Sequence, residues 1–247
     1  PIEGSVGGEA VPSVEADVTE VQIGAHRVLH GDCIDVLRGM PEASFDAVVT
    51  DPPYLIGFMG KEFDRQGGAH TDGEKAQAWH RAWAVEALHV LKPGGHLLAF
   101  GGTRTFHRLA CALEDAGFEI RDCLMWLYGT GFPKSLNIGD GLGTALKPAW
   151  EPIVLARKPL VGTVVENYTK HGTGPLNVDA CRIGTTKDVP RSPSSRLVYG
   201  SALGDNSMDA DGFNPNLGRW PANVALSHEP GCRQIGTRKV RTGTTHE

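Results

Sequence analysis

The alternation of apolar and polar positions predicts an α/β fold. Two segments have the periodicity of amphipathic helices: Glu74–Leu91, and a second that begins at Thr103 as its N-cap and runs to Gly117. Shorter apolar runs are typical of strands, and they cover Ala47–Val49, His96–Phe100, Ile120–Tyr128 and Trp150–Leu160. Strands that alternate with helices predict parallel pairing. The loop before the last strand has no helical periodicity, so we expect an antiparallel pair at that edge of the sheet.

The flanking segments have a different character. Residues 1–20 are polar and rich in Gly, Pro and Glu, which predicts a flexible arm. Val21–His30 alternates as a strand or hairpin, and Asp32 is placed to cap a short helix over Ile34–Met40. Residues 21–160 are therefore expected to form the core. Residues 161–247, rich in Gly, Thr, Asn and Arg, are expected to form a loop-rich extension with short strands in residues 171–184 and 218–227.

The first apolar strand ends abruptly in Asp51-Pro52-Pro53-Tyr54. A Val-rich run of this kind is typical of a strand buried in a parallel sheet, and the two prolines stop further ladder bonding. Ligands of open α/β sheets bind at the carboxyl ends of the strands. The simpler alternative is a tight turn with a solvated aspartate, because Asp-Pro and Pro-Pro are common turn signals.

An acid, bare carbonyl groups and an aromatic ring suit the binding of an exocyclic amine. The lone pair of such a nitrogen is delocalised into the nucleobase ring. The carboxylate of Asp51 and the carbonyl of Pro52 or Pro53 can accept the two amino hydrogens and so direct the lone pair toward an electrophile. Tyr54 offers a flat face for a base taken out of its stack. This chemistry requires that Asp51 face a cavity beside Tyr54 that is large enough for a purine.

The tetrapeptide resembles the [D/N/S]PP[Y/F] catalytic motif of the amino-group DNA methyltransferases. The runs GTGFPKS, KPAWEPIVLARKPL, HGTGPLNVDACRIG and GRWPANV are similar to stretches of phage- and prophage-like members, so the resemblance covers most of the chain. It implies the class I sheet of seven strands, S-adenosylmethionine as cofactor and double-stranded DNA as partner, with Asp51, Pro52, Pro53 and Tyr54 as catalytic residues. An aspartate at the head of the motif favours adenine N6 over cytosine N4.

The resemblance also implies cofactor contacts. Family members place a Gly-Asp pair shortly before the motif, where the acid and its neighbour line the adenine pocket of the cofactor. Here these residues are Asp32 and Cys33, and Asp51 is the third expected contact. Helix capping is the alternative role for Asp32, and one side chain can serve both. The turn Gly101-Gly102 can cradle a phosphate or the carboxylate of the cofactor, or it can allow close packing of a helix on its strand.

One part of the family pattern is missing. In the permuted order, a glycine-rich FxGxG loop is expected near the carboxyl terminus, and nothing after residue 227 matches it. Asp140–Thr144 has glycines but no preceding apolar strand, so Gly129–Lys147 is predicted to be a loop. The sequence therefore predicts a truncated or split enzyme whose first strand has an unpaired edge. Such a chain would bind the cofactor weakly and would need a companion chain or a missing C-terminal region.

The segment Leu55–Gly73 follows the motif directly. It lacks periodicity and is too long for an idle connection. We expect a flap over the flipped base, with Phe58 and Met59 as wedges, and disorder is the alternative.

Composition and charge narrow the setting. No apolar run approaches the length of a membrane span, and the five cysteines include no CxxC pair, which favours a reducing cytoplasm and no structural zinc. Residues 1–156 hold 12 Lys and Arg against 21 Asp and Glu, a balance of −9, whereas residues 157–247 hold 12 against 8, a balance of +4. A basic second part fits a DNA contact surface. Ordinary variation in surface charge and a purely structural extension remain the alternatives.

Two other activities fit parts of the sequence. A methyltransferase of RNA or of protein glutamine also acts on an amine or amide, but such relatives usually carry NPPY and place the glycine loop before it. A non-catalytic DNA-binding fragment fits the missing cofactor loop.

Overall fold

The computed structural model describes residues 18–129, 131, 136–182 and 221–227. The chain divides into two compact units, of which the first comprises Pro1–Cys123 and Ile153–Asn177 and the second comprises Leu124–Pro152 and Val178–Glu247. The predicted arm lies outside the described residues except for residues 18–20. Much of the predicted C-terminal extension, residues 183–220 and 228–247, lies outside them as well.

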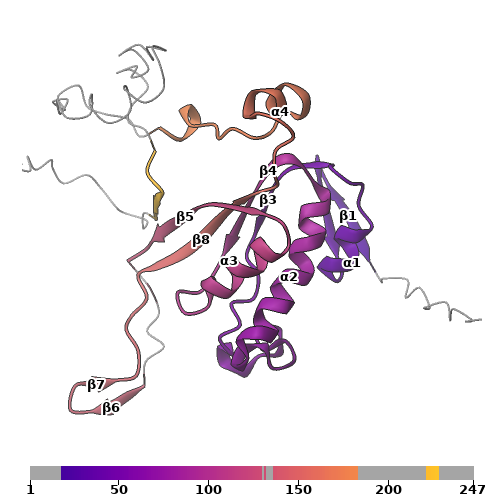
Figure 1. Cartoon of the computed structure of the whole chain (residues 1–247). Coiled ribbons are helices and arrows are strands. Elements are labelled where there is room, and N and C mark those ends of the chain that lie inside the picture. Colours follow the sequence, from indigo (N-terminus) through magenta and orange to yellow (C-terminus); the bar gives the residue numbers. More distant parts are fainter. Residues whose placement is uncertain (1–17, 130, 132–135, 183–220, 228–247) are drawn as a thin grey trace, which may run out of the picture. The chain divides into compact units, whose positions relative to one another are not determined.

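The first unit is built on a mixed sheet, which confirms the α/β fold (Figure 1). Strand β3 (Phe45–Thr50) is parallel to β4 (Leu91–Phe100), and β4 is antiparallel to β8 (Trp150–Arg157). Strand β5 (Glu119–Leu127) is the next neighbour of β8. The antiparallel strand was predicted at an edge, but it lies between β4 and β5. Its residues 152–157 are all buried, and a strand that is apolar on both faces needs neighbours on both sides.

Strand β3 lies at the edge of the described sheet, which confirms the predicted unpaired edge within the described residues. The prediction that this strand is buried is wrong: Val49 is 68% exposed and Phe45 is 41% exposed. Of the residues of β3, Val48 alone packs against the main hydrophobic cluster. The open edge leaves backbone groups of β3 unpaired among the described residues, and because successive side chains point to opposite faces, Val48 and Val49 lie on opposite faces of the sheet.

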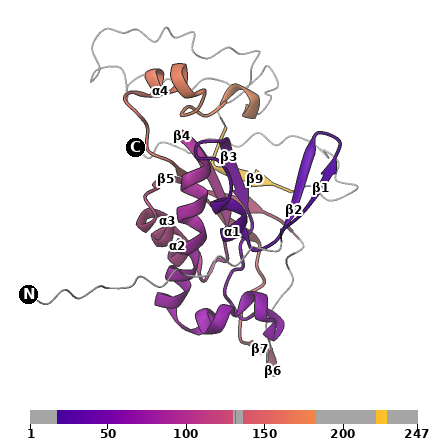
Figure 2. The ribbon, with the colours of Figure 1, turned by 90° about the vertical axis from the view of Figure 1, so that its right-hand side faces the viewer.

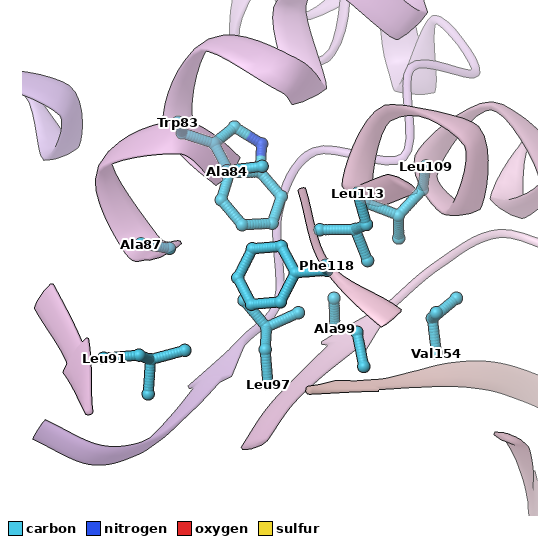
Figure 3. Packing of buried hydrophobic residues seen from close by; sticks show 11 residues of the cluster. Trp83, Ala84, Ala87, Leu91, Leu97, Ala99, Leu109, Leu113, Phe118 and Val154 are labelled. Atoms are coloured by element: carbon cyan, nitrogen blue, oxygen red, sulfur yellow. The ribbon is translucent and has the colours of Figure 1, made fainter. Parts of the chain in front are cut away.

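Three helices lie on one face of this sheet (Figures 1 and 2). They are α1 (Cys33–Arg38), α2 (Gly73–Val90) and α3 (Phe106–Asp115). Asp72 is the N-cap residue of α2, and its carboxylate accepts hydrogen bonds from the backbone of Glu74 and Lys75. The core between helices and sheet includes residues from α2, α3, β4 and β8, as Figure 3 shows: Trp83, Ala84, Ala87, Leu91, Leu97, Ala99, Leu109, Leu113, Phe118 and Val154.

The predicted end of the first long helix needs a correction. Trp83 is buried and Trp79 packs against the core, as the periodicity predicts. The helix ends at Val90, one residue before the predicted end, and β4 begins at Leu91, which pairs with Phe45. The long connection between the motif and α2 was predicted to be a flap or disordered. It contains three short 3₁₀ turns, which are η1 (Phe58–Gly60), η2 (Glu62–Asp64) and η3 (Gln66–Thr71).

Two further elements complete the first unit. Strands β1 (Thr19–Ile23) and β2 (His26–His30) form the predicted hairpin, with Gly24 at φ +60° in its turn. Helix α4 (Val164–His171) was not predicted. It begins with a capping box, in which Thr163 accepts from the backbone of Glu166 and the carboxylate of Glu166 accepts from the backbone of Thr163.

The second unit contains two small strand pairs. Strands β6 (Asn137–Gly139) and β7 (Leu142–Gly143) form a hairpin within the segment predicted to be a loop. Its turn has Asp140 at φ +51° and Gly141 at φ +76°, and Asp-Gly is a strong hairpin signal. Strand β9 (Val224–Leu226) is parallel to β5, which confirms a strand in residues 218–227. The prediction of a strand in residues 171–184 is wrong for the part of this segment that the structure describes. That part contains the 3₁₀ turn η4 (Asp179–Cys181).

Within the described residues, no helix combines the length and the apolar character that a membrane crossing requires.

Candidate active site

The Asp-Pro-Pro-Tyr motif and the glycine turn meet at one end of the sheet. Thr50 pairs with Ala99 in parallel register, so β3 and β4 reach their carboxyl ends side by side. The motif follows β3 directly, and Gly101-Gly102 follows β4 directly. This is the end of an α/β sheet at which ligands bind.

The four motif residues differ in exposure. The side chain of Asp51 is exposed, and none of the described residues forms a hydrogen bond with its carboxylate. Pro52 is buried, whereas Pro53 and Tyr54 are half-buried. An exposed carboxylate is free to accept hydrogen bonds from a ligand.

A narrow hollow lies beside Tyr54, and it has no room for a water molecule. It is lined by Pro53, Tyr54, His80, Phe100, Gly101, Gly102, Thr105, Phe106 and Leu109, and Asp51 is not among these residues. This hollow is therefore not the purine cavity that we expected between Asp51 and Tyr54, and that cavity remains a prediction.

The glycine turn provides close packing. A Cβ atom at Gly101 would lie 3.0 Å from the Cβ of Phe106, and a Cβ atom at Gly102 would lie 3.3 Å from the ring carbon Cδ2 of Tyr54. Because Gly101 has no side chain, α3 can approach β4 closely. Because Gly102 has none, there is room for the ring of Tyr54. The packing alternative is confirmed here, and a role in binding the cofactor remains a prediction.

Thr105 contacts the motif and was missed from the sequence. Its hydroxyl Oγ1 donates a hydrogen bond to the carbonyl oxygen of Tyr54 at 2.7 Å. Thr103 was predicted to cap the following helix, but α3 begins at Phe106 with Thr105 as its N-cap residue. Thr105 makes no side-chain capping bond. A hydroxyl has one hydrogen to donate, and here it serves a residue 51 positions earlier in the chain.

Asp64 is the second missed residue. It is 2% exposed, and its carboxylate accepts hydrogen bonds from three backbone N–H groups just after the motif. The donors are Leu55 at 2.8 Å, Ile56 at 3.1 Å and Phe58 at 2.6 Å. Phe58 and Met59 are 37% and 77% exposed, and their role as wedges remains a prediction.

His80 of α2 is one of the residues that line the hollow, and its imidazole is neutral. Its ring is 3% exposed, and its Nδ1 accepts a hydrogen bond from Nε1 of Trp83 at 3.3 Å. The proton therefore resides on Nε2. Burial lowers the pKa of His80 from 6.5 to about 4.

Two of the three residues predicted to contact the cofactor, Asp32 and Cys33, lie at the start of α1. Asp32 caps this helix, because its Oδ1 accepts from the backbone of Ile34 at 2.9 Å and of Asp35 at 3.3 Å. Both bonds use the same oxygen, so Oδ2 can accept from a ligand. Cys33 is exposed, and its thiol pKa is raised by partial burial of the sulfur and by the charge of Asp32. This thiol stays protonated at neutral pH and suits a contact rather than a nucleophile. No group of His, Cys, Asp and Glu within the described ranges is placed to hold a metal ion.

Comparisons with known proteins point to one family. The N6/N4 methyltransferase family model, described as DNA methylase, matches residues 45–194, which is more than half of the chain. The chain is 30% identical over 198 residues to the type II methyltransferase M.HindIII of Haemophilus influenzae, covering 61% of this chain and 64% of that protein. It is 35% identical over 94 residues to "Putative methylase YubD" of Escherichia coli K12, covering 38% of this chain and 39% of that protein. The chain thus spans less than two thirds of the length of either relative.

Two solved structures are similar at low identity. The PvuII DNA methyltransferase, which is cytosine-N4-specific, has a TM-score of 0.42 and 16% identity, covering 59% of this chain and 54% of that chain. TTHA0409 of Thermus thermophilus, complexed with S-adenosyl-L-methionine, has a TM-score of 0.37 and 23% identity, covering 56% of each chain.

Proposed function

Because the chain belongs to the N6/N4 DNA methylase family, we propose that it transfers a methyl group from S-adenosylmethionine to the exocyclic amine of adenine in double-stranded DNA. The observation that carries the proposal is the position of Asp51. This carboxylate is exposed at the carboxyl end of β3, close in sequence to a restrained, half-buried Tyr54, inside the segment that matches the family. An acid at the head of the motif supports adenine rather than cytosine.

The residues of the motif would act by holding the amine. Asp51 accepts one amino hydrogen, and the carbonyl of Pro52 or Pro53 accepts the other, so the nitrogen lone pair points away from both acceptors. Tyr54 stacks on the base once it has left the duplex. When bound, the cofactor supplies a methyl group on a positively charged sulfur that leaves as a neutral thioether. The chain contributes orientation and fixed acceptors, with no covalent bond to the substrate.

Some of the residues present suit one part of the cofactor. Asp32 has the acceptor Oδ2 available, and Cys33 adds a protonated, exposed thiol beside it. These two residues would hold the adenosine part, together with Asp51 near the reacting end. The glycine loop for the methionine part would come from a companion polypeptide, because no segment of this sequence matches it.

Analysis of the product tests this function. The protein, expressed from its whole gene, is incubated with labelled S-adenosylmethionine and with duplex DNA or RNA, and the digested nucleosides are identified by mass spectrometry. The proposal predicts N6-methyladenine in DNA and none in RNA. N4-methylcytosine would overturn the choice of base. Binding of DNA without incorporation of methyl would overturn the enzymatic function and leave a DNA-binding module.

A further inference from the structure

We propose that Asp64 and Thr105 are positioning residues, which hold the peptide group between Tyr54 and Leu55 from both sides and thereby fix the ring of Tyr54 for the target base. This inference rests on the proposed function, since it concerns the ring on which the base would stack. Neither residue would touch the substrate, and both act through the backbone of the motif.

Both polar atoms of this peptide group are bound by side chains. Thr105, at the start of α3, donates to the carbonyl oxygen of Tyr54 at 2.7 Å. Asp64, in η2, accepts from the N–H of Leu55 at 2.8 Å. The two side chains come from different elements, so a rotation of the peptide plane breaks at least one bond.

The backbone at this point is held in an unfavourable conformation. Leu55 has φ +54°, in the left-handed region that costs energy for a bulky residue. Its side chain is 1% exposed and belongs to a small cluster with Ala69 and Ala76. Burial of the side chain and the two hydrogen bonds together maintain this turn, which sends the chain back toward Asp64.

Asp64 is committed to this turn. Its carboxylate is buried, and the hydrogen bonds that its oxygens accept come from the backbone of Leu55, Ile56 and Phe58. A buried carboxylate is stable only when such donors replace water. The segment after the motif is therefore fixed in position, as a loop that borders a substrate site needs to be.

The ring of Tyr54 has a wall on its other side. A Cβ atom at Gly102 would lie 3.3 Å from Cδ2 and 3.4 Å from Cβ of Tyr54, so this side chain rests on the glycine turn. The glycine turn thus limits the side chain of Tyr54, while the bound peptide group fixes its backbone. A shift of the peptide would move the ring and the base stacked on it, and a small misplacement of reacting groups lowers the rate strongly.

A matched set of variants at Thr105 tests the inference. Thr105→Val removes the hydroxyl at nearly constant volume, Thr105→Ser retains it, and Thr71→Val removes a hydroxyl that bonds to the carbonyl of Gly68 away from the motif. We expect Thr105→Val to lower kcat for methyl transfer about tenfold, the effect of one lost hydrogen bond, with little change in DNA affinity. Thr105→Ser and Thr71→Val should retain kcat. Equal loss in the serine and valine variants, or no loss in either, would overturn the inference.

Amide hydrogen exchange gives a readout that does not depend on activity. Asp64→Asn places an NH₂ group against backbone donors, so the amides of Leu55, Ile56 and Phe58 should exchange at least about tenfold faster than in the parent protein. The amides of β4 serve as the internal control for intact folding. Unchanged exchange would show that the peptide group is not held by Asp64. Faster exchange with an unchanged kcat would refute the positioning role. Failure of the parent protein to methylate DNA would count against the proposed function alone.

Discussion

The neutral state of His80 makes the stability of this protein depend on pH. The imidazole is buried between α2 and the hollow beside Tyr54, and burial lowers its pKa from 6.5 to about 4. The unfolded chain therefore binds a proton at this site below pH 6.5, whereas the folded chain binds it only near pH 4. Between these values the unfolded state carries more protons, so the free energy of unfolding falls as the pH falls.

The size of the effect follows from the shift. A difference of one pKa unit corresponds to about 1.4 kcal/mol, so His80 should lower the free energy of unfolding by about 2 kcal/mol between pH 7 and pH 5. The loss reaches about 3 kcal/mol at pH 4. His96 contributes in the same direction, because partial burial and the charges of Arg157 and Arg121 lower its pKa.

Urea unfolding of His80→Asn measures this contribution. The asparagine oxygen can still accept from Nε1 of Trp83, but the side chain does not titrate. Midpoints are followed by tryptophan fluorescence at pH 7, 6 and 5 for the parent protein, for His80→Asn, and for His107→Asn, an exposed residue of α3. The parent and His107→Asn should lose about 2 kcal/mol more than His80→Asn over this range. Identical pH dependence in all three proteins would refute the reasoning.

Two further predictions concern packing and cofactor affinity. Gly95→Ala should lower the free energy of unfolding by about 1–3 kcal/mol, because its Cβ would lie 2.9 Å from the carbonyl oxygen of Lys92 and 3.0 Å from that of Asp46. Gly39→Ala, whose nearest contact would be 3.5 Å, should change it by less than about 0.5 kcal/mol, and equal effects in urea unfolding would contradict the packing. Calorimetric titration of the 247-residue chain with S-adenosylmethionine should show no saturation at micromolar concentration, because β3 has an open edge within the described sheet. Micromolar affinity of this chain alone would contradict the prediction of a split or truncated enzyme.

The elements that sequence patterns predicted well are those with a strong local signal. The spacing of Trp79 and Trp83 marked the buried face of α2, and Asp32 marked the start of α1. The capping box of Thr163 and Glu166 and the Asp140-Gly141 turn are equally local signals, and they would have revealed α4 and the β6–β7 hairpin.

The features that were predicted wrongly depend on distant partners. The Val-rich run at Ala47–Val49 is typical of a strand buried on both faces, but α1, α2 and α3 lie on one face of the sheet, so Val48 packs against the core and Val49 is exposed. The sequence predicted that Asp51 follows the end of a strand, and β3, which ends at Thr50, confirms this. Thr105 and Asp64 could not be found in this way, because their contacts with Tyr54, Leu55, Ile56 and Phe58 depend on the fold rather than on spacing.

The role of Asp51 is tested most directly by single-turnover methyl transfer to adenine-containing duplex DNA. Asp51→Ala is compared with Asp46→Ala. Asp46 lies in β3, just before the motif, and its exposed carboxylate forms an ion pair with Lys92. Affinity for DNA is measured for both variants in parallel. We expect Asp51→Ala to abolish transfer with DNA affinity retained, and Asp46→Ala to transfer methyl groups at the parental rate. Near-normal transfer by Asp51→Ala would contradict the account.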